Sequence, residues 1–99
     1  MSRKNNLPNR EYGIVLSRSA ERDLNKLEKS DKKALAKIDE KISGLAIDPR
    51  PRGMDKIEGM DNLFRIRSGD YRILYSVDDA KSVVTIEAVG NRRDVYRQY

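Results

Sequence analysis

Residues 63–77 read Leu63-Phe64-Arg65-Ile66-Arg67-Ser68-Gly69-Asp70-Tyr71-Arg72-Ile73-Leu74-Tyr75-Ser76-Val77, and this stretch decides the fold. On both sides of Ser68-Gly69-Asp70 the residues alternate at the period of two that a half-buried strand requires. The apolar set of this alternation is Phe64, Ile66, Tyr71, Ile73, Tyr75 and Val77. The pattern predicts two antiparallel strands joined by a tight turn, with one shared apolar face.

Arginine gathers on the opposite face of this strand pair. If the loop holds four residues, so that Arg67 pairs with Arg72, then Arg65 projects from the same side as these two, because directly opposed residues share a face. Like charges repel across strands, so three guanidiniums on one patch indicate an anionic ligand that they grip bidentately. The alternative is a solvated sheet face that carries arginine and binds nothing.

The composition predicts one folded domain with a heavily solvated surface. The chain has 99 residues, of which 37% are hydrophobic and 37% charged, and this length allows a single two-layer core. No apolar run approaches the roughly 20 residues of a membrane span, so we expect a cytoplasmic protein without a membrane partner. Because cysteine and histidine are both missing, we expect no metal and no cofactor, and any catalysis must use Arg, Lys, Tyr, Asp or Glu.

The net charge of +5 is a weak argument for nucleic acid. Arg3, Lys4 and Arg10 lie among the first ten residues, which contain no acid, so residues 11–99 carry 18 basic against 16 acidic side chains. Residues 1–10 show no periodicity, and we expect them to form a flexible basic arm. The case for nucleic acid therefore rests on how the arginines cluster.

A strand and two helices are predicted ahead of the strand pair. Residues 12–16 form a short strand, after which Ser17 caps a helix with apolar residues on one face: Ala20, Leu24 and Leu27. Asp31, with Ser30, caps a second helix, and Asp48-Pro49 ends it because the residue before proline avoids the helical region. Its apolar stripe repeats at steps of three and four: Leu35, Ile38, Ile42 and Leu45. We assign the lysines of both helices to a solvated face.

A last strand over residues 83–89 ends at Gly90. The order β-α-α-β-β-β predicts an α+β domain over residues 11–99, with a mainly antiparallel four-stranded sheet and an N-terminal helical hairpin on one face. The arginines then occupy the other face. Beyond Gly90 we expect a short basic and aromatic tail or a single helical turn.

Four segments carry a resemblance to a known family: residues 17–27 (Ser-Arg-Ser-Ala-Glu-Arg-Asp-Leu-Asn-Lys-Leu), 48–50 (Asp-Pro-Arg), 63–75 and 90–96 (Gly-Asn-Arg-Arg-Asp-Val-Tyr). In these segments the chain resembles the RelE family of bacterial toxins, within the RelE/ParE superfamily of toxin–antitoxin systems. The first two segments mark the fold, and the last two are more specific. The resemblance implies a single RelE-like toxin domain that cuts mRNA in the ribosomal A site, by attack of the 2′-hydroxyl on the adjacent phosphate.

The resemblance also implies the site residues. The expected catalytic set is Arg65, Arg67, Arg72, Arg92 and Tyr96, and the expected RNA-binding set is Arg65, Arg67, Arg93 and Arg97. Two departures stand out: Asn91 replaces a histidine that many relatives have, and the spacing from Arg92 to Tyr96 is short, so Arg93 competes for the role of Arg92. Asp55 is a second candidate base, since some distant relatives place an acid near this position.

The chemistry divides these roles. Arginine stays protonated and cannot be the base, but guanidiniums around the phosphate stabilise charge that develops in the transition state. Three interpretations of Tyr96 stay open: a phenolate base favoured by Arg92 and Arg93, a ring that stacks on an RNA base, or a terminal tyrosine that closes the core edge. Tyr71 and Tyr75, in phase with Ile73, are assigned to the core.

We therefore predict the toxin of a type II toxin–antitoxin system, a metal-independent endoribonuclease (mRNA interferase) that inhibits translation. Its expected partners are the ribosome, mRNA and a RelB-like antitoxin that binds it in a hetero-oligomer. The alternative is a non-catalytic, ParE-like toxin that binds and poisons DNA gyrase. Such relatives share the fold but usually lack the full basic set, which favours the nuclease.

Overall fold

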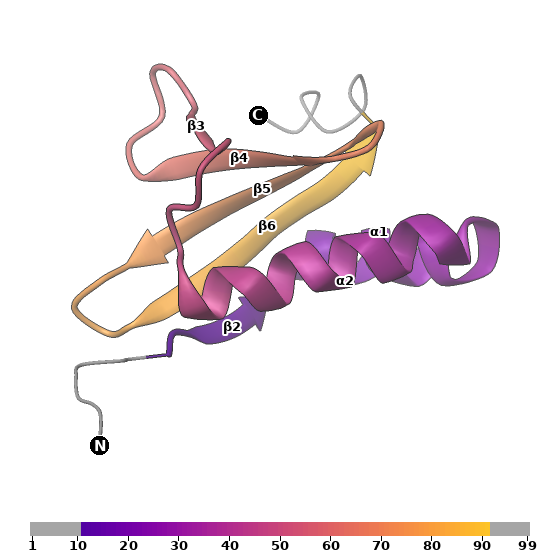
Figure 1. Cartoon of the computed structure of the whole chain (residues 1–99), viewed down its shortest axis with the longest axis horizontal. Helices are drawn as coiled ribbons and strands as arrows, with labels where there is room; N and C mark the ends of the chain where they lie inside the picture. The colour runs from indigo at the N-terminus through magenta and orange to yellow at the C-terminus, as the bar shows by residue number, and fades with distance from the viewer. Residues whose placement is uncertain (1–10, 92–99) are drawn as a thin grey trace.

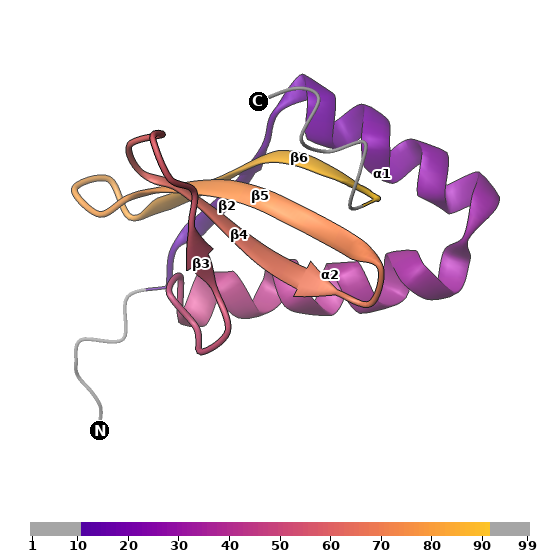
Figure 2. The same ribbon diagram turned by 90° about the horizontal axis from the view of Figure 1, so that it is seen from above.

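The computed structural model describes residues 11–91, which form five strands and two helices in two layers. The elements are β2 (Gly13–Leu16), α1 (Arg18–Ser30), α2 (Lys32–Ile47), β3 (Asp55–Lys56), β4 (Leu63–Ser68), β5 (Tyr71–Asp78) and β6 (Val83–Asn91). Both helices lie on one face of the sheet (Figures 1 and 2). The predicted α+β class is confirmed. The predictions for the arm at 1–10 and the tail at 92–99 lie outside the described residues.

The sheet has the strand order β2-β6-β5-β4-β3. β2 runs parallel to β6, and the other neighbours are antiparallel. The prediction of four strands was one short, because Asp55 and Lys56 of β3 pair with Arg65 and Phe64 of β4. A strand of two residues is too short to show the alternation by which strands are recognised in a sequence.

β6 also runs past its predicted end at Gly90. Gly90 pairs with Arg72 and Asn91 pairs with Tyr71, so β6 pairs with β5 as far as Tyr71, the first residue of β5. A glycine often marks the end of a strand, but the pairing with Arg72 of β5 keeps Gly90 in the sheet. As a result, the end of β6 lies beside Tyr71, the residue that follows the turn between β4 and β5.

Both predicted helix caps form. The Ser17 hydroxyl accepts a hydrogen bond from the Ala20 N–H at 3.0 Å and donates one to the Glu87 carbonyl at 2.7 Å, so the cap also ties α1 to β6. Asp31 accepts from the Ala34 N–H at 3.1 Å at the start of α2. Within residues 11–91, no helix has the length and apolar character needed to cross a membrane.

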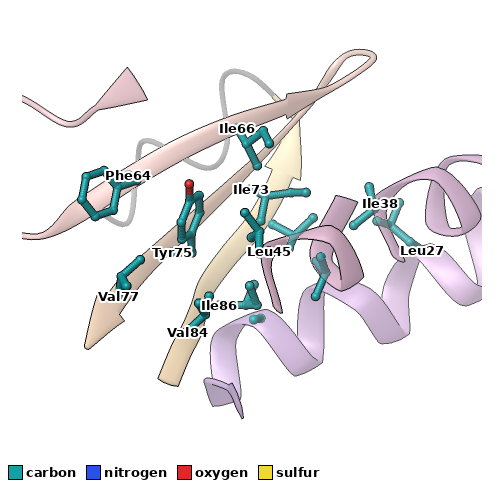
Figure 3. Close-up of a cluster of buried hydrophobic side chains, with 13 residues drawn as sticks. Leu27, Ile38, Leu45, Phe64, Ile66, Ile73, Tyr75, Val77, Val84 and Ile86 are labelled. Carbon is teal, nitrogen blue, oxygen red and sulfur yellow. The ribbon is translucent and has the colours of Figure 1, made fainter. Parts of the chain in front are cut away.

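The main hydrophobic core fills the space between the sheet and the helices (Figure 3). Its buried members come from both helices and from β4, β5 and β6: Ala20, Leu27, Ile38, Ile42, Leu45, Phe64, Ile66, Ile73, Tyr75, Val77, Val84, Ile86 and Val89. The apolar faces predicted for the strand pair and for both helices are confirmed. Tyr75 is fully buried and Tyr71 packs against the cluster, as predicted.

A smaller apolar cluster lies on the opposite face, the face expected to carry the arginines. Leu63, Leu74 and Ala88 are buried there, and Ile57 packs against them. The segment between β3 and β4 covers this end of the face, and the Ile57 N–H donates to the Leu63 carbonyl at 2.8 Å. The arginine face is therefore apolar and covered at one end.

Tyr75 gives a prediction for stability at alkaline pH. Its hydroxyl donates to the Pro49 carbonyl at 2.9 Å, and burial raises the pKa of Tyr75 to about 12. Since this pKa is raised in the folded state, the contribution is fully present below the ordinary tyrosine pKa near 10 and is lost towards pH 12. Tyr75→Phe leaves a buried carbonyl without its donor, so we expect a loss of about 1–3 kcal/mol at neutral pH.

Urea unfolding between pH 9 and pH 12 measures this effect. The free energy of unfolding should fall more steeply with pH in the native protein than in Tyr75→Phe, because only the native protein carries this phenol. The other tyrosines and the lysines titrate in both proteins and cancel in the comparison. If the free energy of unfolding falls equally steeply with pH in the two proteins, ionisation of Tyr75 does not cause the loss of stability at alkaline pH.

Candidate functional site

The site begins at the turn between β4 and β5. Ser68 pairs with Tyr71, so the turn holds two residues, Gly69-Asp70, and not the four considered from the sequence. The register considered with that loop is found, since Arg67 pairs with Arg72. Gly69 has a φ of +61°, a conformation that residues with a side chain adopt rarely. Because the turn sets the register, it places the two arginines directly opposite each other on the sheet face away from the helices.

Neither of these arginines has a carboxylate partner within residues 11–91. The salt bridges in that range are Arg50–Asp79 and Arg65–Asp55. Arg67 is exposed, whereas Arg72 is only 9% exposed and donates through Nη1 to the Tyr71 carbonyl at 3.4 Å. Among the described residues, two permanent positive charges therefore face each other across the strands, and neither is in a salt bridge.

A hollow of 310 Å³ opens beside this pair. The described residues that line it are Arg67, Gly69, Asp70, Arg72 and Asn91. A guanidinium from each strand lines it, and the charge and planar donor geometry of guanidinium suit a phosphate group. Asp70 is the one acid among these lining residues.

Arg65 shares the face but is directed elsewhere. Its Nη2 lies 2.7 Å from Oδ2 of Asp55, which stands opposite it in the β3–β4 pairing. The hydrogen bond from Arg65 lowers the pKa of Asp55, and the charges of Arg65 and Arg67 add to this effect. The three-arginine cluster expected from the sequence is thus a pair, Arg67 with Arg72, plus an arginine held by an acid.

The ion pair between Arg65 and Asp55 makes Asp55 less suited to act as the base. A carboxylate with a lowered pKa is a weaker proton acceptor, and one oxygen of Asp55 is already hydrogen-bonded to Arg65. In turn, Asp55 offsets part of the charge that Arg65 would offer to a phosphate. Asp55 therefore fits a role in positioning Arg65 better than a role as base.

Arg50, from the Asp-Pro-Arg segment, has a structural role. Its Nη1 and Nη2 bind the two oxygens of Asp79 at 3.1 and 2.9 Å, and its guanidinium carbon lies 5.6 Å from the centre of the Phe64 ring. The Tyr12 hydroxyl donates to the same carboxylate at 2.7 Å, and both bonds lower the pKa of Asp79. This network joins the start of the chain to the β5–β6 turn.

Four site residues named by the sequence lie outside the described residues: Arg92, Arg93, Tyr96 and Arg97. Asn91, the last described residue, lines the hollow beside Arg67 and Arg72.

Two basic residues outside the site expected from the sequence also line a hollow. Lys41 and Arg52, together with Arg67, line a second hollow of 400 Å³. A signal existed in the sequence, since Lys33, Lys37 and Lys41 recur every four residues and so lie along one side of α2. Only the fold shows that this side faces β4.

The comparisons place the chain among toxins. The family model described as ParE toxin of type II toxin-antitoxin system, parDE, matches residues 14–96. Toxin RelG of Mycobacterium tuberculosis is 34% identical over 88 residues, which are 88% of this chain and 98% of RelG. Toxin RelE of the same organism is 30% identical over 86 residues, 87% of each chain.

The fold agrees with a solved relative. In the toxin-antitoxin complex RelBE2 from Mycobacterium tuberculosis, the matched chain has a TM-score of 0.71 and 32% identity, with 85% of this chain and 94% of that chain covered. Sequence and fold thus confirm the resemblance to RelE toxins. The chain belongs to the RelE family, within the RelE/ParE toxins of type II toxin–antitoxin systems.

Proposed function

We propose that this toxin is a ribosome-dependent endoribonuclease that acts in the cytoplasm and cuts mRNA in the ribosomal A site. The observation that carries the proposal is the cross-strand pair of Arg67 and Arg72 beside an open hollow. Like charges held directly opposite each other destabilise a sheet, and a bound phosphate relieves this repulsion. An RNA phosphodiester supplies such an anion.

The proposed partner that silences the toxin is a RelB-like antitoxin in a hetero-oligomer. The support is the solved relative RelBE2, which is a toxin-antitoxin complex. An antitoxin that covers the hollow or moves the hairpin turn would block access of RNA to Arg67 and Arg72.

In the proposed mechanism the 2′-oxygen bonds to the adjacent phosphorus as the 2′-hydroxyl loses its proton to solvent or to Tyr96. The bond between phosphorus and the 5′-oxygen breaks, and solvent protonates the leaving oxygen. Arg67 and Arg72 donate N–H groups to the non-bridging phosphate oxygens, whose charge grows as the fifth bond to phosphorus forms. Because this charge is larger in the transition state than in the bound substrate, the two arginines accelerate the reaction rather than only tightening binding. Arg65 adds a third positive charge, reduced by Asp55.

The remaining roles fall to the C-terminal segment. We assign a further contact to the reacting phosphate to Arg92, or alternatively to Arg93. We assign binding of the flanking RNA to Arg97. Tyr96 either removes the 2′-hydroxyl proton as phenolate or stacks on a base to bring the backbone into line. We favour stacking, because a phenol with a pKa near 10 is ionised to only about 0.1% at pH 7.

The end groups of the products test the mechanism. Purified toxin should cut mRNA on programmed ribosomes and leave 2′,3′-cyclic phosphates, since the attacking group is the neighbouring hydroxyl. The Arg67→Ala/Arg72→Ala variant, purified in the same way, is the control for contaminating nucleases. Products with 3′-hydroxyl ends would mean attack by water and would refute the mechanism.

A gyrase assay tests the alternative, because the matching family model carries the name ParE. We expect supercoiling by DNA gyrase to proceed at the same rate with and without the toxin. Inhibition of supercoiling, together with intact mRNA on ribosomes, would replace the nuclease with a gyrase poison.

A further inference from the structure

The second hollow, of 400 Å³, is built by elements that lie far apart in the sequence. Lys41 comes from α2, Arg52 and Gly53 from the segment between α2 and β3, Asp55 from β3, and Ile66 and Arg67 from β4. Arg67 lines this hollow and also the 310 Å³ hollow that Arg72 lines. The two hollows therefore share one guanidinium.

The edge strand β3 is too short to cover the part of β4 that lines the second hollow. β3 pairs with Phe64 and Arg65 only, so within residues 11–91 no further strand covers the edge of β4 at Ile66 and Arg67. An uncovered edge that carries positive side chains is protected from pairing with another strand. It stays accessible to a ligand.

The charges around the second hollow favour an anion. Lys41, Arg52 and Arg67 are exposed, and none of them has a carboxylate partner within the described part of the chain. The single acid of the lining, Asp55, is bound to Arg65 at 2.7 Å. Three positive charges thus meet one carboxylate that is already neutralised in part.

We infer that Lys41 and Arg52, with Arg67, form a second phosphate-binding subsite, which holds the mRNA backbone next to the phosphate bound by Arg67 and Arg72. This inference rests on the proposed nuclease function. Arg67 lines both hollows. An RNA strand that places one phosphate between Arg67 and Arg72 can therefore place a neighbouring phosphate at Lys41 and Arg52. Contacts of this kind position the strand and do not read its sequence.

The test compares two double variants that remove the same charge. Lys41→Ala/Arg52→Ala removes the subsite, and Arg22→Ala/Lys26→Ala removes two exposed basic side chains of α1 as the matched control. In cleavage on programmed ribosomes, the subsite variant should raise KM about tenfold and leave kcat within about twofold, since its contacts help substrate and transition state equally. The control variant should match the native toxin, and circular dichroism of all three confirms folding.

Salt dependence gives a second readout, with a short single-stranded RNA and no ribosome. Each phosphate neutralised in a single strand contributes about 0.7 to the slope of log affinity against log salt concentration, so the slope should shrink by about 0.7–1.4 in the subsite variant. The control variant should keep the native slope. This binding experiment tests the subsite even if the native toxin fails to cut mRNA. Failure to cut mRNA would refute the proposed nuclease function and would leave the test of the subsite intact.

Three outcomes would overturn the subsite. The first is cleavage by the native toxin with KM and salt slope unchanged in the subsite variant. The second is a lower kcat at constant KM, which would place Lys41 and Arg52 in the reaction itself. The third is weaker binding to empty ribosomes with unchanged binding to the short RNA, which would make ribosomal RNA the ligand.

Discussion

Cells that express Arg72→Ala should grow as well as cells without the toxin. Loss of one positioned donor to a developing oxyanion costs about 10²–10³ in rate, or roughly 3–4 kcal/mol of transition-state stabilisation. Arg72 lies on the sheet face away from the main core, so the core packing survives the change. Single-turnover cleavage on programmed ribosomes measures the rate, and growth of the host reports the outcome in the cell.

The burial of Arg72 calls for a matched control, because only 9% of this residue is exposed. Arg72→Met keeps most of the apolar stem and removes the charge, so it separates lost packing from lost electrostatics. We expect Met to be as inactive as Ala but closer to the native protein in thermal stability. An active Arg72→Met variant would show that the stem, and not the guanidinium, is needed.

Arg67→Ala should lower the cleavage rate by a similar factor, about 10²–10³, and should not weaken the fold. Arg67 is exposed and faces a like charge, so its removal relieves repulsion and stabilises the protein by about 0–1 kcal/mol. Activity and stability are thus expected to move in opposite directions. Thermal unfolding and single-turnover cleavage of the same sample measure both.

The control for Arg67→Ala is Arg22→Ala, an exposed arginine of α1 whose loss changes the net charge equally. This variant should cut mRNA at the native rate. The Arg67→Ala/Arg72→Ala double variant should lose less than the product of the two single effects, because both arginines act on one phosphate. Independent, fully multiplicative effects would mean that the two arginines bind different groups.

Local patterns in the sequence were sufficient for both helices, for four of the five strands in the described residues and for part of the site. Each helix begins at a capping residue, Ser17 or Asp31, whose side chain bonds a backbone N–H three positions later. The alternation on both sides of the turn allowed the pairing of Arg67 with Arg72 to be considered from the sequence, although the turn holds two residues and not the four assumed. These interactions span few residues, and their signals lie in adjacent positions of the chain.

The tertiary structure decided which charges are available to a ligand. Arg65 is paired because β3 brings Asp55 opposite it, and a strand of two residues leaves no pattern in the sequence. Lys41 lines the hollow because α2 packs beside β4, a contact between segments about 25 residues apart, and Arg52 joins it from the segment between α2 and β3. The sequence by itself determined the helices, the longer strands, the main core and the opposed arginine pair, because neighbouring residues specify them. Long-range packing alone decided which of the basic side chains are neutralised and which line the open hollows.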